Sequence, residues 1–135
     1  MKHEVLIYNR TRKKIPEKFI KTTITKALRF LKLKQPVEMA VLVVEKKEML
    51  RLNKVWRKKN KTPDELSFGL NSRKTVVVAK EQNSMLNLGE IVVNVEKISD
   101  KKYLSGILIH ALLHLFGYNH LQIEKLEKKL FNHVA

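Results

Sequence analysis

The chain has 135 residues, the length of one ordinary domain, and we expect residues 1–135 to form one core without a linker. Hydrophobic residues make up 44% of it and charged residues 30%, which excludes an intrinsically disordered chain. The absence of cysteine excludes disulfides, cysteine-based metal sites and cysteine nucleophiles. Glu4 interrupts the apolar stretch that a signal peptide needs, and no window reaches the roughly 18 apolar residues of a membrane helix. We therefore expect a soluble cytoplasmic protein.

Strand and helix signals alternate in the first half of the chain. Apolar and β-branched residues predict a strand at 4–8, and Pro16 stands where a helix begins. Apolar residues at three- and four-residue spacing predict an amphipathic helix that ends before Pro36. These residues are Ile20, Thr23, Ile24, Ala27, Leu28 and Leu31. A buried strand is predicted at 37–45 and a second helix at 46–59.

Short apolar runs and one long helical pattern fill the second half. The runs predict strands at 66–70, 75–79 and 88–95. Ser99 or Asp100 is suited to cap a helix that runs to Phe116, and Gly117 is suited to end it. A last helix is predicted at 121–131. Strands and helices without strict alternation predict an α+β fold with a mixed, mostly buried sheet packed with helices.

The charge is strongly positive: 28 Lys and Arg against 13 Asp and Glu give +15. Such a surface attracts polyanions, of which nucleic acid is the commonest in a cell. Lysine enrichment is also typical of heat-adapted proteins, so charge alone leaves both explanations open. With only two aspartates, Asp64 and Asp100, a nuclease built on Asp-held magnesium is disfavoured. Basic clusters at 10–14, 57–61 and 101–102 are candidates to contact an RNA backbone.

Three of the five histidines fall close together, at His110, His114 and His120. Residues four apart on an α-helix share a face, so His110 and His114 can direct both imidazoles at one ion. The turn after Gly117 would bring His120 back toward the pair. Three neutral histidine nitrogens with one open position are typical of a catalytic zinc site. For the pair taken alone, two ordinary histidines are the alternative.

The residue after the first histidine is Ala111, whereas the His-Glu-x-x-His helix of zinc peptidases carries its general base there. The histidine block instead resembles the His-Gly-x-Leu-His-Leu-x-Gly-Tyr-Asp-His signature of the YbeY family, the bacterial endoribonucleases of ribosomal RNA maturation. Segments 52–68 and 88–92 resemble that family's Leu-Asn-x-x-x-Arg, Thr-Asp-Val-Leu-Ser-Phe-Pro and Leu-Gly-Asp-Ile-Val motifs, in the same order. The resemblance covers about residues 37–131.

The resemblance implies a zincin-like α+β fold with its metal-binding helix near the C-terminus. It implies one zinc ion per chain, held by His110, His114 and His120, and endoribonuclease action on ribosomal RNA of the small subunit, in maturation and ribosome quality control. Arg57 matches an arginine that lies near the metal in the family. Arg57 and His114 are the expected catalytic residues. The chain departs from the family pattern at Pro63, Glu65, Gly69, Ala111 and Asn119. Because Asn119 stands where the family has a carboxylate, the general acid or base is not identified.

The expected reaction is attack on a phosphodiester. Zinc lowers the pKa of bound water to about 7, so hydroxide, or a substrate 2′-hydroxyl bound in its place, is available at neutral pH. Arg57 would offset the charge on the phosphoryl oxygens, or else belongs to a solvated basic surface. Ser67 either donates to a phosphate or ends a strand, and Asp64 either accepts from an imidazole or forms a turn.

Three classes of function fit these residues. The favoured one is a metal-dependent endoribonuclease of ribosomal RNA. The others are a ribosome-assembly or RNA-binding factor with little catalysis and a zinc hydrolase of a non-RNA substrate. Ala111 counts against the last of these, and the charge of +15 supports the first two. Neither a nucleotide cofactor nor a membrane partner is expected.

Overall fold

The structure, a computed structural model, describes residues 2–57, 65–69 and 85–134, without the side chains of Trp56 and Arg57. The predicted strand at 75–79 and Asp64 therefore lie outside the described residues. The strands are β1 (Glu4–Asn9), β2 (Val37–Val44), β3 (Glu65–Gly69) and β4 (Leu86–Asn94). The helices are α1 (Glu17–Phe30), α2 (Lys46–Arg57), α4 (Lys101–Leu115) and α5 (His120–Val134), with a 3-10 turn η1 (Val95–Lys97) before α4.

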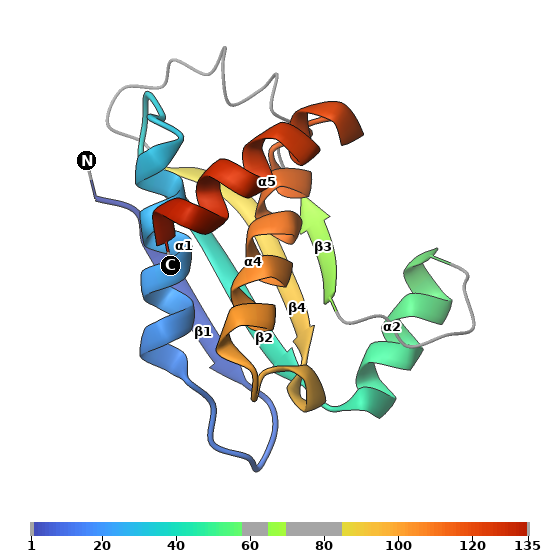
Figure 1. Cartoon of the computed structure of the whole chain (residues 1–135). Coiled ribbons are helices and arrows are strands. Elements are labelled where there is room, and N and C mark those ends of the chain that lie inside the picture. Colours follow the sequence, from blue (N-terminus) through green and yellow to red (C-terminus); the bar gives the residue numbers. More distant parts are fainter. Residues whose placement is uncertain (1, 58–64, 70–84, 135) are drawn as a thin grey trace.

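The described strands form one mixed sheet in the order β1-β2-β4-β3. β1, β2 and β4 run parallel, and β3 pairs antiparallel with β4 at the edge. Helices α1, α4 and α5 lie together over one face of this sheet, whereas α2 lies apart from them (Figure 1). The α+β class and the mixed sheet packed with helices, both expected from the sequence, are confirmed.

The two faces of the sheet are covered unequally. In β2 the fully buried Val41 and Val43 alternate with the half-buried Ala40 and Leu42, because successive side chains of a strand point to opposite faces. Helices α1, α4 and α5 gather on one face, as is common for α+β folds. On the opposite face, Val44, Leu66 and Val92 are buried in a smaller cluster with Met49 of α2, whereas Tyr8 is exposed. The expectation of a mostly buried sheet is therefore correct for the first face and for part of the second.

The glycine of the Leu-Gly-Glu-Ile-Val motif is explained by the sheet. Gly89 has a φ of +118° and pairs with Gly69 across the β3–β4 ladder. A Cβ atom at this position would lie 2.1 Å from the carbonyl oxygen of Phe68. Only glycine allows β3 to approach β4 this closely, so this motif residue has a structural role.

Helix α4 occupies the middle of the helical layer. Asp100 caps it, because its Oδ1 accepts hydrogen bonds from the backbone N–H groups of Lys102 and Tyr103. Leu104, Leu108 and other apolar residues on most sides of the helix are buried in the core. No helix in the described parts of the chain is long and apolar enough to cross a membrane.

Candidate functional site

His110 and His114 lie one turn apart on α4, and their rings meet edge to face. Their Nε2 atoms are 2.9 Å apart, and the ring centroids are 4.6 Å apart at an interplanar angle of 71°. His110 is half-buried and His114 is exposed, whereas the flanking Ile109, Leu113 and Leu115 are buried. The core therefore holds the helix rigidly while the two imidazoles remain accessible.

The turn after α4 ends the helix as the sequence predicts. Gly117 has a φ of +77°, its N–H donates to the carbonyl of His114, and the N–H of Tyr118 donates to the carbonyl of Leu113. This pair of bonds is a Schellman motif, which reverses the chain direction in a few residues. His120 follows as the first residue of α5, with its ring centroid 6.1 Å from that of His114.

Asn119 caps helix α5. Its Oδ1 accepts a hydrogen bond from the N–H of Gln122, and the Gln122 Oε1 accepts one from the N–H of Asn119, each at 2.9 Å. This reciprocal arrangement is a capping box, in which Asn and Asp serve equally well. Asn119 therefore has a structural role as the cap of α5 in this chain.

Glu127 is a member of this cluster that the sequence reasoning missed. The Nδ1 atom of His110 lies 2.5 Å from Oε1 of Glu127, on the side of the ring away from His114. A carboxylate on the second ring nitrogen is the usual partner of a metal-binding histidine. The available signal was its spacing: Glu127 comes seven residues after His120 and thus lies on the same face of α5.

The histidine pair fits two positions of a zinc site. Two imidazole nitrogens that share a tetrahedral zinc ion at about 2.0–2.1 Å lie about 3.3 Å apart, close to the 2.9 Å between His110 and His114. Within the described residues, no group of three or more His, Cys, Asp or Glu side chains converges closely enough to hold a metal ion. His120 is therefore near the pair without completing a set of three ligands, and its coordination remains a prediction.

The other predicted site residues are placed as follows. Arg57 is the last residue of α2, and its side chain, like the whole of Asp64, lies outside the described part. Ser67 sits in the middle of β3 opposite Ile91, which belongs to the core under the helices, and α4 contacts this strand. The alternative that Ser67 ends the strand is therefore wrong. Ala111 is fully buried and contributes no polar group to the site.

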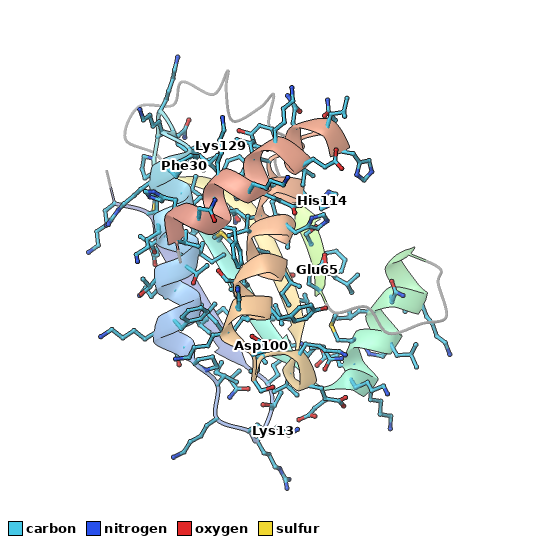
Figure 2. All side chains as sticks on the ribbon, in the orientation of Figure 1. Lys13, Phe30, Glu65, Asp100, His114 and Lys129 are labelled. Carbon is cyan, nitrogen blue, oxygen red and sulfur yellow. The ribbon has the colours of Figure 1, made fainter. Side chains whose placement is uncertain are left out.

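Two of the three basic clusters lie far from the histidines. Figure 2 shows His114 at the end of α4 beside α5, whereas Lys13 and Asp100 lie at the opposite end of the molecule. In the 10–14 cluster, Arg10 forms an ion pair with Glu48 at 2.7 Å. In the 101–102 cluster, the Lys101 ammonium lies 5.4 Å from the ring centroid of Phe19. The third cluster, 57–61, falls outside the described side chains.

Comparison with known proteins agrees with the family resemblance of the histidine block. A sequence model of the family described as Endoribonuclease YbeY matches residues 6–135. A relative of that name from Spiroplasma citri is 28% identical over 98% of this chain and 89% of its own length. One from Bartonella quintana is 31% identical over 86% of this chain and 78% of its own length, and one from Bartonella henselae is 30% identical over 98% and 85%.

The fold also has a counterpart among solved structures. The solution structure of TM1509 from Thermotoga maritima matches with a TM-score of 0.60 at 24% identity, over 96% of this chain and 88% of that protein. This likeness shows the fold, and the family model spans nearly the whole chain, including both helices of the histidine cluster. The chain thus belongs to the YbeY family of endoribonucleases.

Proposed function

We propose that this protein is a zinc-dependent endoribonuclease, with residues 1–135 acting as one zincin-like catalytic domain. Its substrate would be ribosomal RNA, in maturation and quality control of the small ribosomal subunit in the cytoplasm. The observation that carries this proposal is the pair His110 and His114, with facing Nε2 atoms 2.9 Å apart and Glu127 on the far nitrogen of His110. Family membership supports RNA as the substrate class.

The proposed zinc ligands are His110, His114 and His120, with the fourth position open to water or substrate. A zinc ion there supplies a water whose pKa is about 7 and a Lewis acid for a phosphoryl oxygen. The exposed positions of His114 and His120 suit a large substrate, because an RNA strand can reach them without entering a deep cavity. Ala111 is buried at the position where zinc peptidases carry a glutamate as general base, which favours a phosphodiester over a peptide bond as the substrate.

Arg57 is the proposed second catalytic residue. Its guanidinium would donate to the phosphoryl oxygens as negative charge develops on them in the transition state. The planar fork of arginine suits this task, because two parallel N–H groups match two oxygens of a phosphate. His114 is proposed both as a zinc ligand and as a catalytic residue. It is the more exposed of the two histidines on α4, so it would lie nearer to a bound phosphate.

The test is cleavage of ribosomal RNA by protein freed of trace nucleases. We expect a chelator-sensitive activity that zinc restores and that His114→Ala reduces to background. His133→Ala is the matched control, because His133 is exposed near the end of α5 and its ring lies against Phe30, with the centroids 5.0 Å apart. Binding of RNA without cleavage, at full zinc occupancy, would instead identify a ribosome-assembly factor and reject the nuclease.

A further inference from the structure

We infer that Glu127 is a positioning residue for the histidine pair. It holds His110 in the tautomer whose Nε2 lone pair faces His114, and it fixes the register of α5 against α4. Glu127 lies outside every motif of the sequence analysis. The inference rests on the proposed function only in assuming that the pair binds a metal ion.

The first step of the argument is the direction of one hydrogen bond. The Oε1 of Glu127 lies 2.5 Å from Nδ1 of His110. An ionised carboxylate has only acceptors, so the ring nitrogen must donate. A histidine that binds a metal ion is neutral and has a single N–H group, so Nε2 of His110 then carries the lone pair. That nitrogen is the one 2.9 Å from Nε2 of His114.

The second step is the register of the two helices. His120 and Glu127 are seven residues apart, nearly two helical turns, and so share one face of α5. His110 and His114 share one face of α4. The chain reversal at Gly117 turns these faces toward each other, with Glu127 against His110 and His120 beside His114. The contact between Glu127 and His110 therefore also helps to set the position of His120 along the axis of α4.

The third step is the expected size of the effect. Loss of a carboxylate behind a metal-binding histidine typically weakens metal affinity 10- to 100-fold. The side chains of His110 and Glu127 are 40% and 38% exposed, beside a groove of about 320 Å³ between α4 and α5. Because water competes for a half-exposed hydrogen bond, we expect the lower end of that range, about tenfold.

The experiment compares three variants of the full chain. Glu127→Leu removes the acceptor, and Glu127→Gln keeps a neutral acceptor oxygen. Glu124→Gln is the matched control, because Glu124 is exposed on the same helix and its loss changes the net charge equally. Long-range proton–nitrogen NMR correlations of the metal-free protein report the His110 tautomer. Competition with a chromophoric chelator gives the affinity for zinc alone.

We expect wild-type His110 to carry its proton on Nδ1, and Glu127→Leu to lose that preference together with about tenfold in zinc affinity. Glu127→Gln should fall between Leu and wild type, and Glu124→Gln should match wild type. If the contact between Glu127 and His110 only stabilised the fold, both Glu127 variants would have a lower melting temperature without metal, and the tautomer of His110 would not change. If Glu127→Leu does not fold, the Gln variant, which changes one atom, carries the test.

Two results would overturn the inference: a wild-type His110 protonated on Nε2, or equal zinc affinities for the Glu127 variants and Glu124→Gln. Both readouts are independent of RNA. A wild-type protein that binds zinc in a Glu127-dependent way but cleaves no RNA would therefore reject the proposed function and support this inference.

Discussion

The two ends of helix α4 use their polar residues for different purposes. At the N-terminal end, Asp100 caps the helix, Lys101 lies over the ring of Phe19, and the nearby Arg10 is paired with Glu48. At the C-terminal end, the polar side chains on the exposed stripe are His110 and His114, which contact each other. The polar groups of the first end form contacts that stabilise the fold, whereas His110 and His114 at the second end are accessible imidazoles on an otherwise mostly buried helix.

This difference teaches where to look for function in a basic protein. Density of positive charge in the sequence pointed to the clusters at 10–14, 57–61 and 101–102. The structure places the first and the last at the end away from the histidines, and the second lies outside the described side chains (Figure 2). We place the proposed site instead at the accessible histidine stripe of α4, a helix that is otherwise mostly buried. The predictions below test this contrast between the two ends.

The largest expected effect separates Arg57 from Arg10. We expect Arg57→Ala to lower the cleavage rate by about 10²–10³, the cost of losing one donor to a developing oxyanion. Arg57→Lys should restore part of it, because the charge remains and the bidentate fork is lost. Zinc content, measured by elemental analysis, should stay at wild type. Arg10→Ala should leave the rate within about twofold and cost about 0.2–1 kcal/mol of unfolding free energy.

Full activity of a folded, zinc-loaded Arg57→Ala protein would assign Arg57 to the solvated surface. A large loss of rate in Arg10→Ala, with normal folding, would show that the basic end also contacts the substrate near its scissile bond. The second result would break the contrast between the two ends of α4, whereas the first would remove Arg57 from the proposed site.

A smaller effect is expected at the two glycines of α4 and its turn. Gly117→Ala forces a Cβ atom into the left-handed region at φ +77°, which should lower the unfolding free energy by about 1–2 kcal/mol. Zinc affinity should fall with it, because the turn positions His120. Gly106→Ala is the control: its Cβ atom meets nothing within 4 Å, and alanine favours the helix by about 0.8–1.0 kcal/mol. Urea denaturation should thus shift in opposite directions for the two variants, and equal shifts would contradict the assigned turn.

The smallest effect concerns His3, far from the histidine pair in sequence. Its Nδ1 accepts a hydrogen bond from the N–H of Val37 at 3.0 Å, and burial, with the charge of Arg29 acting in the same direction, lowers its pKa. The unfolded chain therefore binds a proton more readily, so this contribution to stability is present above about pH 6.5 and is lost as the pH falls through the lowered pKa.

We expect His3→Asn, which keeps an acceptor at the same place without a titrating ring, to reduce the loss of unfolding free energy between about pH 7 and 5. At about pH 8 the variant and the wild type should be close in stability. Urea titrations at each pH measure the difference. An unchanged pH dependence would show that the stability of the protein does not depend on a neutral His3 at the start of β2.

Local signals in the sequence determined much of the histidine helix. A cap at Ser99 or Asp100, the end of α4 at Gly117 and a shared face for His110 and His114 were all predicted; the structure has the cap at Asp100 and shows the other two features. These features depend on backbone groups and side chains within five residues of each other, so the sequence alone is sufficient. The capping box of Asn119 and Gln122 is equally local, and its three-residue spacing was a readable signal that was missed.

The tertiary structure decided the rest. The contact of Glu127 with His110 spans 17 residues and depends on the angle at which α5 returns across α4. The sheet order β1-β2-β4-β3, and with it the face that the helices cover, follows from crossover connections that no window of the sequence contains. The distance of the 10–14 cluster from the histidines has the same cause, because packing in the core sets the distance between segments far apart in the chain. The 101–102 cluster is separated from the histidines by the length of α4 itself, which the sequence predicted.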